Sequence, residues 1–261
     1  MPHRIRVFVI TALAALFAVT GIGLAEASSI VYLRSNTGAP WGQTTNEQAM
    51  DLAFGAGNWD DLRFETVNIA ALFSGGTSFI FMEGSDFTAN EMETFLAANQ
   101  AALEGWVAGG GSVFINAAPN EGDGMSYGFG GVSLNYSDFS GSATAINGAH
   151  AIFNGPLLPA GTNFTGNWFS HASVSGGGIT GLIQDDDGSF VLASLSFGAG
   201  HALFGGMTTT NWHDPDPNSL NLRANILSYG ADQATPVPEP ATLSLLGLGF
   251  LGAARRLRRK K

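Results

Sequence analysis

The first half of the chain alternates short apolar runs with amphipathic segments. Apolar or alternating runs at residues 29–33, 62–67, 77–82 and 112–116 predict strands. The third run is apolar throughout, which is typical of a strand buried on both faces. Helical patterns separate the strands, so this half predicts an α/β unit with a parallel sheet.

Two Thr-x-x-Glu/Gln patterns, beginning at Thr45 and Thr88, predict where helices start. An apolar face follows each of them. The second helix is expected to span residues 89–108, because an apolar stripe runs along this segment and three consecutive glycines follow it.

The second half of the chain predicts mainly strands. Runs at residues 132–136, 179–184, 190–195 and 201–206 are separated by turn residues. A last amphipathic segment, residues 219–229, predicts a closing helix.

Four stretches resemble the class I glutamine-amidotransferase-like superfamily. They are FIFMEGSDFTANEMETFLAANQAALEGWVAGGGSVFI from residue 79, HAIFNGP from residue 150, VLASLSFGAGHALFGG from residue 191 and NLRANILSYG from residue 221. The resemblance implies a flavodoxin-like α/β sandwich over residues 28–231. Its sheet would be mainly parallel, with an added β-rich C-terminal part.

Catalytic members of that superfamily carry a Cys nucleophile after the strand that follows the Gly pair. Here that strand leads into Asn116-Ala117-Ala118-Pro119, and the chain has no Cys. Thiol amidotransferase chemistry is therefore excluded by residue type.

Residues 1–27 predict a secretory signal peptide. Two arginines precede an almost wholly apolar run, residues 7–19, and an A-x-A cleavage site follows at Ala25 and Ala27. An uncleaved anchor helix is the alternative interpretation.

The other end carries a Pro-containing linker (232–240), an apolar segment (241–254) and a basic tail (255–261). At ~1.5 Å per residue the apolar segment covers about 21 Å, short of the ~30 Å hydrocarbon core of a bilayer. It would therefore need flanking residues to cross a membrane as a transmembrane helix. The basic residues of the tail would stay in the cytoplasm, which agrees with an exported body.

The order of Val237-Pro238-Glu239-Pro240, apolar segment and Arg-rich cluster resembles the PEP-CTERM sorting signal of Gram-negative bacteria. This resemblance implies export, retention in the inner membrane through the C-terminal segment, and removal of the tail by an exosortase, a membrane protease-transpeptidase. It also implies a final place at the cell surface or in an extracellular matrix that contains exopolysaccharide. The alternative is an ordinary tail anchor behind a Pro-rich linker.

The body between the two ends is strongly acidic. Its basic residues are Arg34, Arg63 and Arg223, whereas almost all of the chain's 21 Asp and Glu residues lie there. Such a surface repels phosphates, so nucleic-acid binding is excluded. The absence of Cys also removes thiolate metal ligands, and no cofactor is expected.

Gly124-Met125-Ser126-Tyr127-Gly128 matches the G-x-S-x-G pattern of serine hydrolases. That pattern works on a tight strand-to-helix elbow that exposes the Ser hydroxyl beside a His. Here it lies in a Gly-rich loop beyond the predicted strand 112–116, which favours a chance match. No catalytic residue is therefore expected.

Asp185, Asp186 and Asp187 place three adjacent carboxylates on a predicted hairpin turn. Water or a cation would relieve their repulsion, but they lack the alternating spacing of an EF-hand loop, so they are only a weak Ca²⁺ candidate. The histidines also lack the spacing that puts two imidazoles on one helix face. No metal site is expected.

Trp212, His213, Asp214 and Asp216 follow the last predicted strand, where the carboxyl edge of an open α/β sheet binds ligands. An indole beside an imidazole and carboxylates suits a sugar, because the ring stacks on the sugar face and the polar groups bind hydroxyls. A surface loop stiffened by Pro explains the same residues.

Two functional interpretations remain open. The first is a non-catalytic exported surface or matrix protein, sorted by an exosortase, whose ligand is a polysaccharide. Trp41 and Trp59, in other loops, would add aromatic surface or pack in the core. The second is a degenerate amidotransferase-like hydrolase that uses Ser126 or the pair His213 and Asp214.

Overall fold

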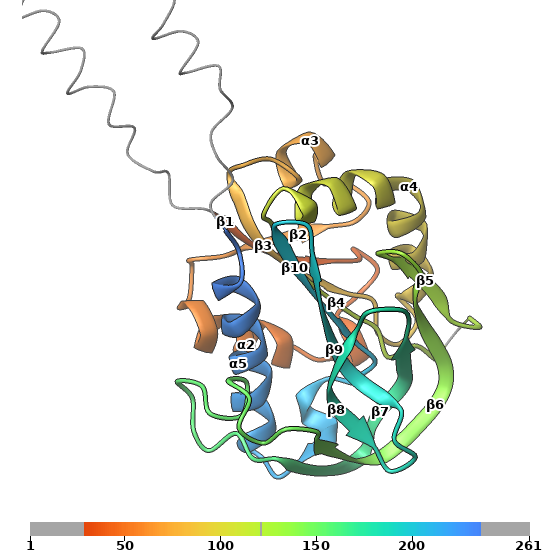
Figure 1. The fold of residues 1–261 in the computed structure, drawn as a ribbon, viewed down its shortest axis with the longest axis vertical. Coiled ribbons are helices and arrows are strands. Elements are labelled where there is room, and N and C mark those ends of the chain that lie inside the picture. Colours follow the sequence, from red (N-terminus) through yellow and green to blue (C-terminus); the bar gives the residue numbers. More distant parts are fainter. Residues whose placement is uncertain (1–28, 121, 236–261) are drawn as a thin grey trace, which may run out of the picture.

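The computed structural model describes residues 29–120 and 122–235, which form one mixed sheet with helices on both faces (Figure 1). The strands are β1 Ser29–Arg34, β2 Asp60–Arg63, β3 Thr77–Glu83, β4 Ser112–Asn116, β5 Met125–Gly128, β6 Val132–Ala145, β7 Asn163–Ser175, β8 Thr180–Asp185, β9 Phe190–Phe197, β10 Gly200–Gly205 and β11 His213–Asp214. The helices are η1 Pro40–Gly42, α2 Thr45–Phe54, α3 Ile69–Leu72, α4 Ala89–Ala108, η2 Thr210–Trp212 and α5 Asn218–Asp232.

The sheet joins a parallel part to a larger antiparallel part. Strands β2, β1, β3, β4 and β10 run parallel in that spatial order. Beyond β10, the strands β9, β8, β6, β7 and β11 continue the sheet with antiparallel pairings, and β5 pairs antiparallel with β6.

The expected flavodoxin-like, amidotransferase-like sandwich with a mainly parallel sheet is therefore wrong, because most pairings are antiparallel. The strands expected after residue 132 are present, but they make up the larger part of the sheet. The pattern did not indicate β7, and β6 continues to Ala145 although only residues 132–136 were expected.

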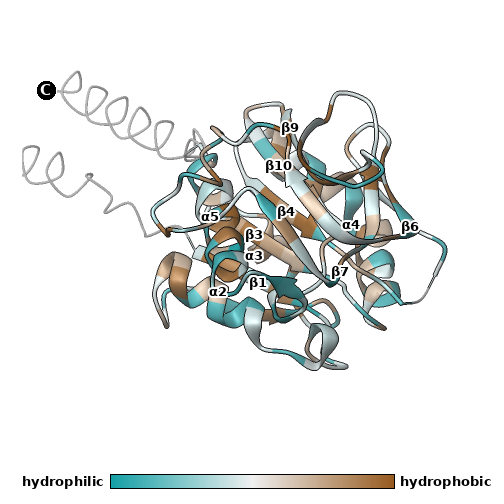
Figure 2. Ribbon diagram, turned by 90° about the horizontal axis from the view of Figure 1, so that it is seen from below, coloured by the Kyte–Doolittle hydropathy of each residue, from teal (hydrophilic) through white to brown (hydrophobic). Residues whose placement is uncertain are grey.

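The central strands separate two apolar cores. In β3, Ile80 and Met82 face a core shared with α4, whereas Phe79 and Phe81 face a core shared with α2 and α5. Successive side chains of a strand point to opposite faces, so a strand covered on both faces is apolar throughout. Figure 2 shows the apolar residues concentrated in these central strands.

Both helix starts were found near the expected places, but not with the expected caps. Helix α4 spans Ala89–Ala108 as expected, with Thr88 at its N-cap position. No side-chain cap bond forms there, and the Thr88 hydroxyl donates to the Ser85 carbonyl at 2.7 Å. Helix α2 also begins without a side-chain cap, and Thr44 occupies its N-cap position.

The described ends of the chain lie together at the amino edge of the parallel strands. The Ser29 amide donates to the Gly76 carbonyl, just before β3, and the Thr235 amide donates to the Gly110 carbonyl, just before β4. Within residues 29–120 and 122–235, no helix is long and apolar enough to span a bilayer. The expected signal peptide, most of the linker, the expected span 241–254 and the basic tail lie outside the described residues.

Candidate functional site

The carboxyl ends of β3, β4 and β10 meet at the edge of the sheet opposite the chain ends. Asn116, the last residue of β4, forms hydrogen bonds that connect these strand ends. Its side-chain amide donates to Glu83 at 2.9 Å and to the Met207 carbonyl at 2.8 Å, and its side-chain carbonyl accepts from the Met207 amide at 3.1 Å. The loops that follow these strands are thereby held side by side.

Strand β7 brings a distant segment to this edge. The His171 amide donates to the Gly206 carbonyl at 3.1 Å, and the Thr208 amide donates to the Phe169 carbonyl at 3.0 Å. This pairing seats residues 168–171 beside the segment that leads from β10 to Trp212.

A buried ion pair connects the elements that meet at this edge of the sheet. Arg223 Nη1 lies 3.6 Å from Glu83 Oε2, and both side chains are almost fully buried. The Arg223 Nη2 group donates to the Thr208 carbonyl at 2.7 Å. The guanidinium also lies over the rings of Phe81 and Phe114. The pair therefore joins α5 to the end of β3 and to the β10 loop.

Burial raises the pKa of Glu83 to about 7, although Arg223, Ser85, Asn116 and Asn46 oppose this shift. A buried carboxylate is costly unless it is paired and hydrogen-bonded. Because Glu83 is fully buried, we assign it a structural role at this edge of the sheet and do not expect it to contact a ligand.

Five ring side chains above this pair form a continuous surface, which we call the aromatic edge: Trp41, Phe139, Trp168, His171 and Trp212. His171 is at its centre, with its ring centroid 4.6 Å from that of Trp41 and 4.6 Å from that of Phe139. Trp41 in turn lies 6.2 Å from Trp212, and Phe139 lies 5.8 Å from Trp168. All four contacts are edge-to-face.

Two rings of the aromatic edge are open to solvent, whereas His171 at its centre is only 6% exposed. Trp168 is 50% exposed and Phe139 is 41% exposed, which is unusual for side chains of this size. Two indole groups on the inner side, Trp41 Nε1 and Trp212 Nε1, are buried and have no hydrogen-bond partner among the described residues. Buried donors without partners are rare in folded proteins and call for a specific explanation.

Backbone strain is concentrated around the same surface. Among the described residues, five that are not Gly have positive φ, and four of these, Trp41, Asp86, Ser137 and Trp168, belong to the aromatic edge or to the segments beside it. A bulky residue in this region of φ costs on the order of 1–3 kcal/mol, and such residues cluster at functional sites.

His171 is held in one orientation within the aromatic edge. Its Nδ1 lies 3.2 Å from the Pro119 carbonyl, which only accepts hydrogen bonds, so Nδ1 carries the proton and donates. Burial lowers the pKa of His171, although Pro119 and Asp86 oppose this shift. At neutral pH the ring is uncharged, and Nε2 is left as an acceptor.

The four residues expected to bind a ligand separate into two groups. Trp212 belongs to the aromatic edge, and Asp214 and Asp216 are exposed beside it. His213 is buried instead. Its Nε2 lies 2.9 Å from the Thr208 hydroxyl and 3.0 Å from the Phe169 carbonyl, and its ring stacks on Phe169.

Burial lowers the pKa of His213 to about 3, and Arg223 acts in the same direction. A neutral imidazole whose Nε2 is bonded to Thr208 and Phe169 holds the loop in place. Trp59 lies elsewhere, and its Nε1 donates to Asp51 at 2.9 Å.

Ser126 lies on β5 and not on a strand-to-helix elbow. The Ser126 hydroxyl accepts from the Gly128 amide at 3.3 Å, and no imidazole among the described residues is hydrogen-bonded to it. The geometry required for a serine nucleophile and its base is not formed here.

Asp185 ends β8, and its Oδ1 accepts from the Asp187 and Ser189 amides at 3.1 and 2.8 Å. Asp186 accepts from the Ser140 hydroxyl at 2.7 Å. In the described part of the chain, no three His, Cys, Asp or Glu side chains are arranged to hold a metal ion. The carboxylates of Asp185 and Asp186 thus accept hydrogen bonds within and beside this turn.

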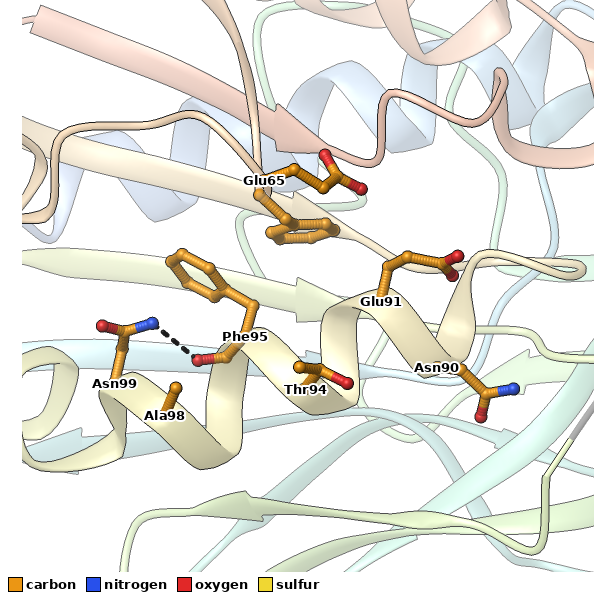
Figure 3. Close-up of a pocket in the computed structure, with 8 residues that line it drawn as sticks. Glu65, Asn90, Glu91, Thr94, Phe95, Ala98 and Asn99 are labelled. Carbon is orange, nitrogen blue, oxygen red and sulfur yellow. Dashed lines mark hydrogen bonds between the residues drawn. The ribbon is translucent and has the colours of Figure 1, made fainter.

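A separate pocket of about 360 Å³ lies between α4 and the segment after β2 (Figure 3). Two of its polar residues are bonded within the fold: Glu65 accepts from Ser35 and from the Asn36 amide, and the Asn99 side-chain amide donates to the Phe95 carbonyl. Phe95 packs on Phe64 in its wall. This pocket carries no functional assignment.

Phe139, Trp168 and His171 were not expected at the site. Trp168 and His171 reach it through the pairing of β7 with the β10 loop, and Phe139 reaches it from an irregular part of β6. No local sequence pattern predicts the pairing of β7 with the β10 loop or the irregular part of β6. Trp41 is expected in a loop, and the structure places it in η1, the short 3-10 helix that follows β1.

Residues 236–260 match the family described as a PEP-CTERM protein-sorting motif. The chain is therefore an exported protein with an exosortase sorting signal, as its C-terminal pattern predicted. No curated protein matches the chain.

Several solved structures are distantly similar to the chain. An exo-β-1,4-mannosidase from Opitutaceae bacterium strain TAV5 is 16% identical, with a TM-score of 0.46 over 80% of this chain and 36% of its own. A β-galactosidase from Rahnella sp. R3 is 13% identical, with a TM-score of 0.46 over 81% of this chain and 33% of its own. This chain thus spans about a third of either glycosidase.

A putative GMP synthase component from Thermoplasma acidophilum is 10% identical, with a TM-score of 0.48 over 78% of this chain and 95% of its own. The activities of these three proteins are their own and are not carried over to this chain.

Proposed function

We propose that the chain is a non-catalytic protein of the cell surface or extracellular matrix that binds carbohydrate through the aromatic edge. The C-terminal sorting motif supports the location, because it belongs to an exported protein that an exosortase processes.

The aromatic edge is the observation that carries the proposal. Exposed indole and phenyl rings stack on the apolar faces of sugar rings, and His171 Nε2 adds a fixed acceptor for a sugar hydroxyl. The strain at Trp41 and Trp168 indicates that the fold holds these rings in place at an energetic cost.

The absence of catalysis is part of the same proposal. The Nε2 of His213 is bonded within its loop, Ser126 has no imidazole among its described hydrogen-bond partners, and Glu83 is buried. These observations support the proposal that the three groups take no part in hydrolysis.

Binding of the full-length chain to a glycan array and to the extracellular polysaccharide of its host tests the proposal. We expect Trp168→Ala to weaken binding at least tenfold, because half of this indole is free to stack on a ligand. Its free energy of unfolding should change by less than about 1 kcal/mol, as is usual for an exposed position.

Leu158→Ala is the matched control, since Leu158 is 64% exposed and lies outside the aromatic edge. Unchanged binding by Trp168→Ala, or equal losses in both variants, would refute carbohydrate binding at this surface.

A further inference from the structure

We propose that the aromatic edge selects sugars that carry a positive charge, that is, amino sugars with a free ammonium group, over neutral and acidic sugars. This proposal rests on the carbohydrate-binding function proposed above and names its ligand class. Three features of the described residues support it: the carboxylates beside the rings, the engagement of the arginines elsewhere, and the exposed ring faces.

Asp86 lies directly beside the centre of the aromatic edge. It forms a bridge with Pro119, the residue whose carbonyl accepts from His171. One of its carboxylate oxygens accepts from the Asn120 side-chain amide at 3.1 Å, which fixes the side chain. Asp86 is partly exposed, so its charge is not fully screened by protein atoms.

Further carboxylates are adjacent to the rings along the chain. Asp138 immediately precedes Phe139 on β6, although its charge acts on Asp185, the last residue of β8. The exposed Asp214, on β11, follows Trp212 by two residues. Strand β11 pairs with β7 close to Trp168, with Asp214 opposite Thr165. Asp86 therefore places negative charge next to His171, and Asp214 adds a carboxylate close to Trp212 along the chain.

The described residues place no cation there to balance this charge. Arg34 forms a bidentate pair with Asp61, and Arg63 also binds Asp61, at the β2 end of the sheet. Arg223 is buried with Glu83. His171 is neutral at neutral pH, so it does not repel an ammonium group.

The chemistry of the rings then selects among sugars. The face of an aromatic ring carries negative charge, and indole attracts cations most strongly. An ammonium group on a stacked sugar would meet ring faces and carboxylates together. The same carboxylates would repel the negative charge of a uronic acid. A neutral sugar would be bound by ring stacking alone.

The test compares three oligosaccharides of equal length by isothermal titration with the full-length chain in detergent. They are a β-1,4-linked glucosamine hexamer, its N-acetylated form, which is neutral, and a galacturonic acid hexamer. At low salt we expect the glucosamine hexamer to bind about tenfold more tightly than the N-acetylated form. The difference should shrink at high salt, because screening weakens charge attraction.

Two variants separate site-specific selection from general attraction to an acidic protein. Asp86→Asn removes a charge at the site, and Asn tolerates the positive φ of this residue. It should reduce the tenfold preference to about threefold or less. Asp60→Asn removes an exposed charge on β2, remote from the aromatic edge, and should leave the preference unchanged.

Equal binding of the glucosamine and N-acetylated hexamers, or tighter binding of the neutral or acidic one, would overturn the selectivity while the proposed function stands. Equal losses of preference in both Asp variants would overturn it as well. If none of the three hexamers binds and no other glycan binds, both proposals fail.

Discussion

His171 and His213 are buried imidazoles at the same edge of the sheet, yet their surroundings give them different roles. His213 Nε2 is bonded to Thr208 and Phe169, so it holds a loop. His171 uses Nδ1 for the Pro119 carbonyl, which leaves Nε2 as an acceptor at the centre of the aromatic edge. Residue type alone does not separate these roles, because hydrogen-bond partners far along the chain decide them.

The ionisation of Glu83 gives a prediction at the residue scale. Its pKa is about 7 in the folded chain, against 4.5 for an ordinary Glu. Between these values the folded protein keeps a proton that the unfolded chain has released. The contribution of Glu83 to stability is therefore fully present below pH 4.5 and is lost as the pH rises through 7, by up to about 1.4 kcal/mol per pH unit.

Glu83→Gln should remove this contribution, so the difference in unfolding free energy between the native chain and the variant should shift steadily from pH 4.5 to pH 7. Urea unfolding at four pH values measures it. Glu93→Gln, at an exposed position of α4, is the control and should give a difference that does not change in this way. If the unfolding free energies of the native chain and of Glu83→Gln change with pH in the same way, the raised pKa of Glu83 is contradicted.

At the scale of the element, the pairing of β7 with the loop after β10 creates the aromatic edge. Gly206 allows this pairing, because a Cβ atom there would collide with the Ala172 carbonyl. Strand β6 contributes through irregular pairing between Tyr136 and Ser140, with Ser137 at positive φ. Such a bulge redirects side chains, and it places Phe139 against His171.

Gly206→Ala should destabilise the chain by about 3 kcal/mol, because the added methyl group has backbone atoms in its way. The same shift should displace His171 and weaken glycan binding. Gly177→Ala, where a Cβ atom would meet nothing within 4 Å, should change the unfolding free energy by less than ~0.5 kcal/mol. Equal stability of the two variants in denaturant unfolding would show that β7 does not approach the loop so closely.

These elements also show what the sequence predicts and what it leaves open. Strands β3 and β4 and helix α4 were predicted well, since both faces of each strand and one face of the helix are apolar. Strand β7 was missed, and β6 was cut short, because their exposed positions alternate irregularly with Ser, Asn and Gly. The antiparallel half, and with it most of the candidate site, depends on contacts between distant segments.

At the scale of the whole molecule, the aromatic edge and the described chain ends lie on opposite edges of the sheet. Ser29 and Thr235 are bonded to the segments that precede β3 and β4, whereas Trp41, Trp168 and Trp212 gather where the parallel strands end. Figure 1 shows both described ends at one side of the molecule. A chain held at its C-terminus would thus present the aromatic edge away from the attachment.

Processing of the tail is a prediction at this scale. The intact mass of the protein recovered from its native envelope should end near Val237–Pro240, without the basic tail, because the sorting motif spans residues 236–260. A mass that keeps Lys261 in all of the recovered protein would indicate a simple tail anchor.

Retention of the processed protein in the extracellular polysaccharide of its host tests the central claim most directly. Cells would produce either the native chain or Trp41→Ala/Trp168→Ala, and the polysaccharide fraction would be separated from the medium and probed for each protein. We predict that the native chain stays with the polysaccharide and that the double variant, equally processed and folded, is released into the medium. Equal retention of both proteins would contradict carbohydrate binding by the aromatic edge.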